Sequence, residues 1–325
     1  MTTARQISRH VVKSVLSIET PEGDGVTVRR SIGTSKLRNF TPFLMLDHFH
    51  VPPGGSFPDH PHRGMVTATY MLKGFFDHED FVGHRGRIGP GDLQFMIAGK
   101  GIMHAEMPVH EKGLDDPIGL QLWIDLPKQH KLVPPSYQEL NSSQIPTAHP
   151  TRNTRVKVIC GESDNEDGET VSSPVRPLGG CWYSDWVFEK KGEKSFQRIP
   201  KGWNSFIYTL SGQLIVGPST PASSNLISPF HTVILSNNNI DNNNPSDSDS
   251  EGETETGIYL ESASEEPTRF VIISGEPLIG QEIVQHGPFV MDSQRGILEA
   301  FEDFREGKNG FEGAREWRSE IGKGR

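Results

Sequence analysis

The sequence of 325 residues contains only two cysteines, Cys160 and Cys181. Two isolated cysteines provide neither a disulfide framework nor paired thiolates for structural zinc, so we expect both to be small buried side chains in a reducing compartment. The N-terminus lacks the apolar core of a secretory signal, and no apolar run approaches the ~20 residues that span a bilayer. The sequence therefore predicts a soluble protein of the cytoplasm, the nucleus or both, without membrane contact.

Basic charge is also scarce. The formal net charge is -10, and no dense run of Lys and Arg occurs. Because nucleic-acid-binding proteins present a basic face to phosphate, we expect no direct contact with nucleic acid. Hydrophobic residues make up 34% and charged residues 23% of the chain, which is typical of globular proteins, and the length suits two domains at roughly 150 residues each.

Helical periodicity is rare over most of the chain, whereas short alternating runs between Gly and Pro turns recur. Closely spaced strands of this kind favour β-sandwiches or barrels over alternating βαβ units. The clearest predicted strands are Met65–Leu72, Asp92–Ile97, Leu120–Leu126, Arg155–Cys160, Ser205–Leu210 and Arg269–Ser274.

One amphipathic helix is predicted near the C-terminus, over residues 293–306. Ile297, Phe301 and Phe304 lie at helical spacing behind the capping pair Asp292-Ser293. The helix should pack this apolar stripe on a barrel.

A short internal repeat divides the strand-rich region into two halves. Tyr70-Met-Leu-Lys-Gly74 matches Tyr208-Thr-Leu-Ser-Gly212, and each copy resembles a strand that enters a tight turn. Because each half carries one copy, the sequence predicts an all-β protein of two similar β-barrels with a C-terminal α-helix.

We predict four consecutive segments: an N-terminal metal-binding barrel (1–134), a linker (135–154), a metal-free C-terminal barrel (155–292), and a helix with a tail (293–325). Within the second barrel, residues 237–255 are rich in Asn, Ser and acidic side chains and almost free of apolar ones. Such a segment cannot offset its ordering entropy by burial, so we predict a disordered surface insertion.

Histidine is concentrated in the first half of the chain. The sequence has 13 histidines, and nine of them lie in one stretch: His48, His50, His60, His62, His78, His84, His104, His110 and His130. The patterns His60-Pro-His62 and His104-Ala-Glu106 matter most, because residues i and i+2 of an extended chain point to the same face.

If paired strands bring these two segments together, three imidazoles and one carboxylate converge. This set suits a first-row metal with open coordination positions, and the absence of thiolates disfavours a closed zinc site. The alternating pair His48 and His50 offers rival ligands, or side chains at the mouth of a pocket.

Several longer motifs are similar to those of the pirin family in the cupin superfamily. They are Phe57-Pro-Asp-His-Pro-His-Arg-Gly64, Pro90-Gly-Asp92, Gly99-Lys-Gly-Ile-Met-His-Ala-Glu-Met-Pro108, Gly275-Glu-Pro-Leu-Ile-Gly280 and Gln285-His-Gly-Pro-Phe-Val-Met291. The resemblance covers nearly the whole chain except the insertion. It implies two cupin-type barrels, a bicupin, with one metal ion in the N-terminal barrel.

The resemblance also implies the metal and its ligands. The ion would be iron, Fe2+ or Fe3+, held by His60, His62, His104 and Glu106, and other first-row divalent metals would also suit this site. The glutamate that general cupins place soon after the His-x-His pair is missing at Met65-Val-Thr67. In the second barrel, Arg198 and Pro200 stand at the positions that correspond to His60 and His62, so no metal is expected there.

Two functions are compatible with the resemblance. One is a quercetin (flavonol) 2,3-dioxygenase, in which the metal acts as a Lewis acid on a substrate hydroxyl and Glu106 is the general base. The apolar residues Phe43, Met45, Phe49 and Phe57 would then line a pocket for a small aromatic substrate, or simply belong to the barrel core.

The alternative is a redox-sensing nuclear transcription co-regulator that contacts a transcription-factor protein without turnover. The acidic net charge suits a protein partner better than DNA. In either case the expected state is a monomer.

Overall fold

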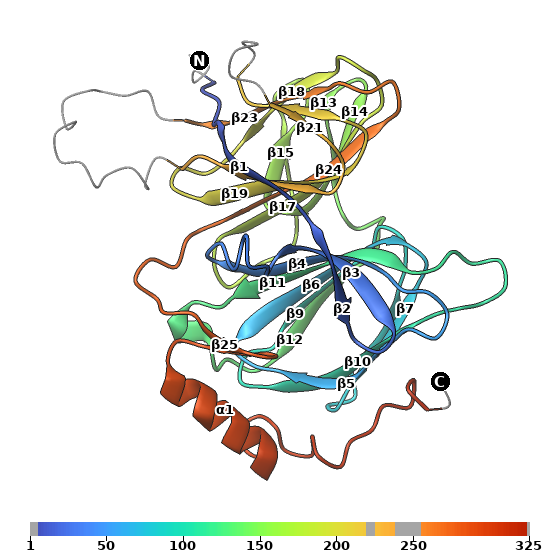
Figure 1. Cartoon of the computed structure of the whole chain (residues 1–325), viewed down its shortest axis with the longest axis vertical. Helices are drawn as coiled ribbons and strands as arrows, with labels where there is room; N and C mark the ends of the chain where they lie inside the picture. The colour runs from blue at the N-terminus through green and yellow to red at the C-terminus, as the bar shows by residue number, and fades with distance from the viewer. Residues whose placement is uncertain (1–5, 219–224, 238–254, 324–325) are drawn as a thin grey trace. The chain divides into compact units, whose positions relative to one another are not determined.

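The computed structural model describes residues 6–218, 225–237 and 255–323, and most of its regular structure is β-strand (Figure 1). The predicted all-β class with one C-terminal helix is confirmed. The chain forms two compact units. The histidine-rich unit comprises Ile18–Gln144 and Leu278–Arg325, and the second unit comprises Ile145–Pro277 with the N-terminal segment that ends at Ser17.

The histidine-rich unit has two main antiparallel sheets. The larger sheet has seven strands in the spatial order β12-β9-β6-β11-β4-β3-β2. Its strands are β2 (Ile18–Glu22), β3 (Val26–Ile32), β4 (Phe43–His50), β6 (Met65–Lys73), β9 (Leu93–Ile97), β11 (Ile118–Asp125) and β12 (Ser136–Leu140). The smaller sheet has the order β5-β10-β7-β8. Its strands are β5 (Phe57–His62), β7 (Phe76–Asp80), β8 (Arg85–Ile88) and β10 (Ile102–Pro108).

The second unit repeats this arrangement of seven and four strands. Its larger sheet has the order β1-β22-β19-β24-β17-β14-β13. Its strands are β1 (Val11–Leu16), β13 (Thr147–Thr151), β14 (Thr154–Cys160), β17 (Cys181–Phe188), β19 (Asn204–Ser211), β22 (His231–Leu235) and β24 (Thr268–Gly275). The smaller sheet has the order β18-β23-β20-β21. Its strands are β18 (Lys194–Arg198), β20 (Leu214–Val216), β21 (Asn225–Ile227) and β23 (Gly257–Ser262), and a hairpin of β15 (Glu162–Asp164) and β16 (Thr170–Ser172) completes the unit.

The predicted internal repeat occupies equivalent places in the two units. Tyr70 on β6 and Tyr208 on β19 are both buried, and the glycines that follow, Gly74 and Gly212, have φ of 64° and 69°. Only glycine adopts this left-handed conformation without strain, which explains the shared Tyr-x-Leu-x-Gly pattern. Each unit is a cupin-type jelly roll of two sheets rather than one closed barrel.

The two units are not consecutive in sequence. Strand β1 pairs with β22 of the second unit, although residues 1–134 were predicted as one domain. Residues 135–154, predicted as a linker, contain β12 and β13, which form one edge of each seven-stranded sheet. β12 pairs with the distant strand β9 and β13 with the neighbouring strand β14, and the composition of this stretch indicated neither pairing.

The C-terminal segment packs on the histidine-rich unit. It consists of the hairpin β25 (Val284–His286) and β26 (Phe289–Met291), followed by the helix α1 (Gln294–Glu306), which lies beside this hairpin in Figure 1. The Ser293 side chain accepts a hydrogen bond from the Gly296 amide, and Gly307 ends the helix in the left-handed region. The buried face includes Ile297 and Ala300.

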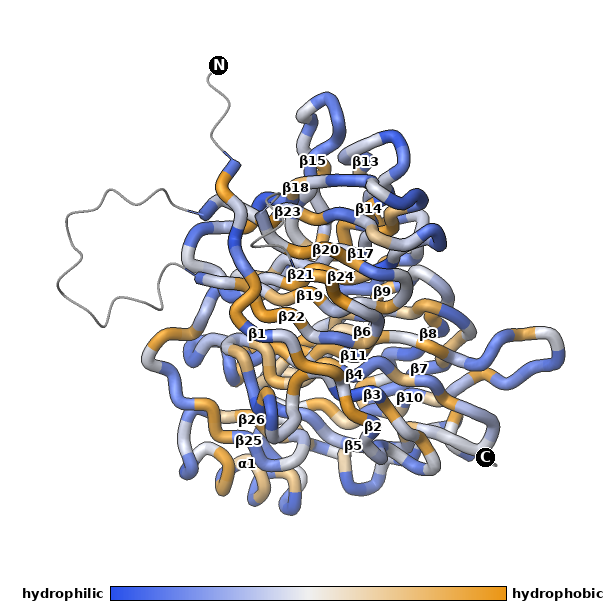
Figure 2. The backbone as a smooth tube through the Cα atoms, turned by 45° about the horizontal axis from the view of Figure 1, so that its top comes forward, coloured by the Kyte–Doolittle hydropathy of each residue, from blue (hydrophilic) through white to orange (hydrophobic). Residues whose placement is uncertain are grey.

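The apolar residues lie mainly along the strands, as the orange segments of Figure 2 show. Both cysteines are buried, as predicted, and the pKa of the Cys181 thiol is raised by its hydrogen bond with Cys160 and by burial. The predicted insertion lies outside the described residues except for its ends, Asn237 and Glu255. A short 3-10 turn spans Lys128–His130 in the histidine-rich unit. In the described part of the chain, no helix is long and apolar enough to cross a membrane.

Candidate metal centre

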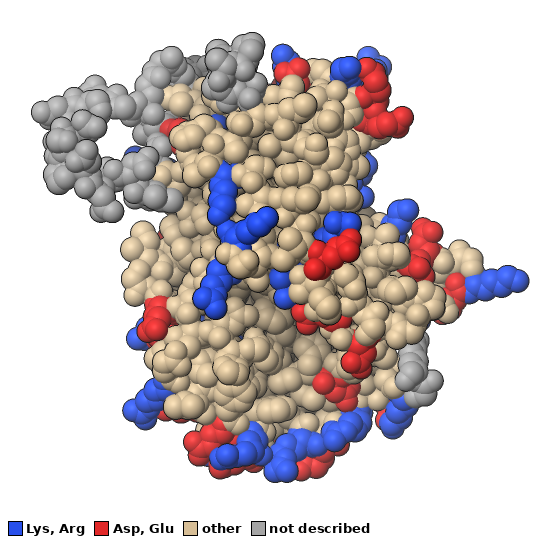
Figure 3. All heavy atoms as spheres, in the orientation of Figure 1, with Lys and Arg blue, Asp and Glu red and all other residues tan. Residues whose placement is uncertain are grey.

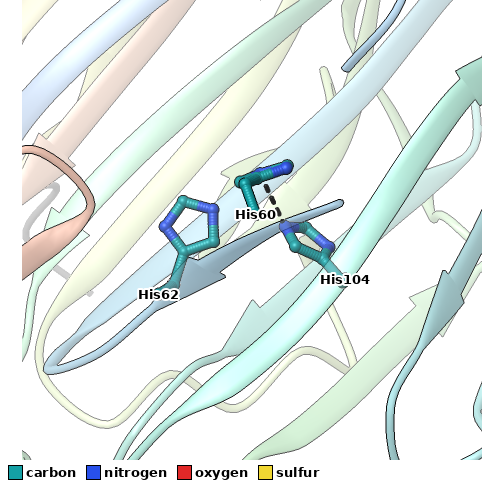
Figure 4. Close-up of side chains that lie close together, drawn as sticks. All are labelled: His60, His62 and His104. Carbon is teal, nitrogen blue, oxygen red and sulfur yellow. Dashed lines mark hydrogen bonds between the residues drawn. The ribbon is translucent and has the colours of Figure 1, made fainter. Parts of the chain in front are cut away.

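Three histidines meet where β5 and β10 pair. The two strands are antiparallel with His104 opposite His60, and His62 follows two residues along β5. The ring centroids of His60 and His104 are 4.4 Å apart, and His62 lies 4.8 Å from the first and 5.1 Å from the second. Figure 4 shows the three side chains gathered from the two strands. The structure therefore brings the predicted imidazoles together, with ligand atoms within 4.8 Å of one another.

The surroundings favour neutral rings with free lone pairs. His60 Nδ1 lies 2.7 Å from the Pro58 carbonyl oxygen, which can accept only if this nitrogen carries the proton, so Nε2 of His60 is left unprotonated. Burial lowers the pKa of His62 well below its usual value, and His60 lowers it further. Burial also lowers the pKa of His104, with additional effects of His60, His62 and His78. Neutral imidazole is the form that binds metal.

The three histidines cannot satisfy one another's ring nitrogens by hydrogen bonds, whereas a metal ion can bind them. His62 Nδ1 is buried and has no hydrogen-bond partner within the described residues. His60 Nε2 and His104 Nε2 are 3.0 Å apart, so at most one of these two nitrogens can donate to the other. One ligand nitrogen of each ring lies within 4.8 Å of the others. A first-row divalent ion would satisfy one nitrogen of each ring, and imidazole suits iron, nickel, copper and zinc.

Glu106 lies on the same face of β10 as His104 and lines the same cavity, but it is outside the compact group of three histidines. Its carboxylate is buried and receives a hydrogen bond from Gln121 Nε2 (3.3 Å to Oε2). The Thr69 hydroxyl lies 3.1 Å from Glu106 Oε1 and 2.9 Å from Gln121 Oε1, so its one proton is shared between these two acceptors. A register shift between His104 and Glu106 separates the carboxylate from the pairing of His104 with His60. Glu106 is thus oriented by β6 and β11, the strands behind it.

The rival histidines are elsewhere. His48 and His50 on β4 belong neither to the metal group nor to the cavity wall. His50 is exposed, and its Nε2 lies 3.4 Å from Asp116.

His60 and His62 open into a cavity of about 520 Å³, within the range of small-molecule sites. Three of the four apolar residues proposed from sequence, Met45, Phe49 and Phe57, line it, whereas Phe43 is buried outside the cavity wall. Phe49, Phe57 and Phe76 form an aromatic cluster with centroid distances of 5.4 to 6.3 Å.

The cavity wall also carries a charge pair. Arg30 Nε donates to Asp47 Oδ1 at 2.8 Å and a terminal nitrogen donates to Oδ2 at 2.6 Å. Burial raises the pKa of the Asp47 carboxyl, and the two bonds from Arg30 oppose this effect. Trp123 stands edge-on to His62 at 5.2 Å. One side of the cavity is therefore aromatic and the other polar.

A buried lysine ties the turn after β5 to the C-terminal segment. Lys131 Nζ donates to the carbonyls of Gly64 (2.9 Å) and Val290 (3.0 Å) and pairs with the Asp125 carboxylate. Burial lowers the pKa of Lys131 and raises that of Asp125, and their mutual attraction opposes both effects. The pair fixes the turn two residues after His62.

Thr69, Gln121 and Lys131 were not predicted as site residues from the sequence. Gln121 had the clearest signal, because it is a polar residue within the apolar run Leu120–Leu126 and so needs a buried partner. Lys131 and Thr69 carried no comparable signal, since single Lys and Thr residues are common in turns and strands.

The second unit has no group of three metal-ligating residues among those the structure describes. Arg198, at the position corresponding to His60, forms an ion pair with Asp164 at 2.6 Å.

Comparisons with known proteins place this site in a family. The model described as Pirin matches residues 25–124, and the Pirin C-terminal cupin domain matches residues 183–310. The protein named Pirin from Mus musculus is 45% identical over 317 residues, covering 97% of this chain and 99% of its own. The human Pirin is 44% identical with the same coverage.

Solved structures share the fold. A quercetin 2,3-dioxygenase from Acinetobacter baumannii superposes with a TM-score of 0.76 at 26% identity, covering 94% of this chain and 99% of its own. The bacterial pirin YhhW from Escherichia coli, in complex with nickel(II), has a TM-score of 0.58 at 16% identity, covering 82% of this chain and all of its own. At that identity the second comparison supports the shared fold alone.

Proposed function

The chain belongs to the pirin family, and we propose that it binds one iron ion through His60, His62, His104 and Glu106 and cleaves flavonols such as quercetin with dioxygen. The observation that carries this proposal is a group of three imidazoles, two of which line an aromatic cavity of about 520 Å³ together with Glu106. The solved quercetin 2,3-dioxygenase with the same fold supports it. Other first-row divalent ions also suit the ligands.

The overall reaction consumes one flavonol and one O2 and yields a ring-opened ester and carbon monoxide. A bound metal ion supplies Lewis acidity, which lowers the pKa of a coordinated flavonol hydroxyl. The residues of the chain orient and deprotonate the substrate. Phe49, Phe57 and Phe76 would hold the flat ring system by aromatic contact.

Glu106 would accept the hydroxyl proton as general base. Hydrogen bonds from Thr69 and Gln121 hold its two oxygens in place, so the carboxylate does not need to reorganise when substrate binds. All of these residues come from one chain, which is compatible with a monomer.

The test is turnover by anaerobically iron-loaded protein that is mixed with quercetin and air. We expect flavonol absorbance to fall as carbon monoxide appears, and Glu106→Gln to remove both signals. His110→Asn is a matched control, since His110 is partly exposed and lies outside the cavity wall. Absence of turnover at full iron occupancy would contradict the dioxygenase proposal.

The second candidate is a redox-sensing co-regulator in the nucleus or cytoplasm that binds a protein partner. It is favoured by contacts of the C-terminal tail with the strands of the site. The amide of Ser319 donates to Asp59, next to His60, and that of Glu320 donates to Glu79, next to His78. A tail whose hydrogen exchange is the same in the Fe2+ and Fe3+ proteins would argue against this role.

A further inference from the structure

We propose a second metal site in the histidine-rich unit, formed by His78, His84 and Glu139, which binds a first-row divalent cation such as Zn2+ or Co2+. His78 lies on β7, His84 in the turn before β8, and Glu139 on β12 of the other sheet. The three ligand atoms lie within 4.8 Å of one another. This group shares no residue with the first site and does not depend on flavonol cleavage.

The two imidazoles converge on one carboxylate oxygen. His78 Nε2 is 3.0 Å and His84 Nε2 is 3.3 Å from Glu139 Oε1. Both contacts are at ion-pair distance and lower the pKa of Glu139 as hydrogen bonds would, but neither is well enough aligned to satisfy its buried nitrogen. His78 is only 3% exposed. An unsatisfied nitrogen this deeply buried is costly unless it directs a lone pair at a cation.

A glycine keeps space open beside these ligands. Gly86 faces His78 across the pairing of β7 and β8. A Cβ at this position would lie 2.7 Å from His78 Nε2 and 3.8 Å from Glu139 Oε2. The φ of Gly86 is not in the left-handed region, so its backbone does not require glycine. The missing side chain leaves volume between an imidazole nitrogen and a carboxylate oxygen.

Neighbouring groups hold the ligands in place. Tyr137 stacks on the His84 ring at 4.2 Å, Asp80 accepts a hydrogen bond from the His84 amide, and Gln94 Nε2 donates to Glu139 Oε1 at 2.8 Å. Burial raises the pKa of Glu139, but the proximity of His78, with Gln94 and His84, outweighs it and lowers the pKa to about 2. Outer partners of this kind are typical of metal sites.

The donor set limits the choice of metal. Two imidazoles and one carboxylate suit zinc and its first-row neighbours, and three protein ligands leave a coordination position for water. The His84 side chain is 36% exposed, which gives a cation a path from solvent.

The proposal is tested by measuring how many metal ions bind to each chain. Chelator-treated, desalted protein is titrated with Co2+ and with Zn2+, and bound metal is measured by calorimetry, mass spectrometry and the visible Co2+ spectrum. We expect two equivalents for the natural chain. His84→Ala and Glu139→Gln should each remove one equivalent, and Gly86→Ala should weaken it by filling the space. His104→Ala should remove the other equivalent, and His110→Ala should remove neither.

Two variants are needed because loss of the His84 ring could perturb the turn in which it lies. Glu139→Gln removes a ligand but preserves the shape of the side chain. Circular dichroism identifies any variant that does not fold. One equivalent in the natural chain that His104→Ala abolishes would overturn the second site and leave the proposed function intact. A second equivalent that survives in both His84→Ala and Glu139→Gln would place the metal elsewhere and also overturn it.

Discussion

The backbone around the first site sets the chemistry of its side chains. The Pro58 carbonyl fixes the tautomer of His60, and Pro61 separates His60 from His62 without an amide proton. Proline is tolerated here because β5 is the edge of its sheet and need not donate on both sides. The His-Pro-His sequence thus presents two imidazoles from a strand that pairs only with β10.

The hydroxyl of Thr69 provides a test of how Glu106 is held. We expect Thr69→Val to lower iron affinity or flavonol cleavage by about 10- to 100-fold, because the carboxylate loses an orienting hydrogen bond. The measurements are iron content and kcat/KM. Thr67→Val is the matched control, since Thr67 is buried two residues away on β6 and is not in the cavity wall. Equal effects of both changes would indicate a packing role only.

Residue spacing was enough to predict the three histidines but not their supporting partners. His60 and His62 stand at i and i+2 of one strand, and His104 belongs to the His-Ala-Glu motif of another. Pairing of these two strands brings the three rings together. Glu139 approaches His78 only because β12 of one sheet lies near β7 of the other. Contacts between sheets depend on the packing of the whole unit, so no local pattern in the sequence revealed them.

At the scale of elements, the helix α1 is anchored through Arg63 to the strand that carries His60 and His62. This residue follows His62, and its guanidinium donates to Asp303 Oδ2 on α1 (2.8 Å), to the Asn309 carbonyl (2.8 Å) and to the Lys100 carbonyl (2.6 Å). It also lies 4.7 Å from the centre of the Phe311 ring. A single buried cation therefore joins the end of β5, the turn before β10 and the C-terminal segment.

We expect Asp303→Asn to lower the free energy of unfolding of the histidine-rich unit by about 3–5 kcal/mol, because it leaves the buried Arg63 unpaired. Glu299→Gln is the matched control on the same helix. It breaks the exposed Arg295–Glu299 pair, which should contribute less than ~0.5 kcal/mol. Chemical denaturation monitored by fluorescence gives both values, and similar losses would contradict the anchoring role.

The sequence predicted the elements better than their assignment to units. Each of the six predicted strands is present, and the predicted helix 293–306 corresponds to Gln294–Glu306. Phe301 was predicted to lie on the buried stripe of the helix, but its side chain is 40% exposed. Ala300 instead takes the inner position, and Phe301 lies at the edge of the buried face. The pairing of Val11 with Leu235 could not be predicted, since period-2 alternation shows that a strand exists and not where its partner is.

At the scale of the molecule, the two units have the same architecture but different chemistry. Both groups of metal-ligating residues in the described chain belong to the histidine-rich unit. The second unit instead has a large apolar core, in which Trp186 and Phe270 stack at 5.9 Å. On the face shown in Figure 3, acidic and basic side chains are mixed along the lower edge, and a short row of basic ones lies near the middle.

This division predicts that metal stabilises one unit only. Each unit has its own core, so calorimetry should show two unfolding transitions, and iron added anaerobically should raise only one of them. At a free iron concentration 100 times Kd, the gain is about 2.7 kcal/mol, or on the order of 5–10 °C for a unit of this size. The tryptophans Trp182, Trp186 and Trp203 report on the second unit, and their transition should stay in place.

His104→Ala should remove the iron-dependent shift at the first site, because a ligand can stabilise only the unit whose folded state binds it. A single transition that iron shifts as a whole would mean that the two units unfold as one cooperative structure.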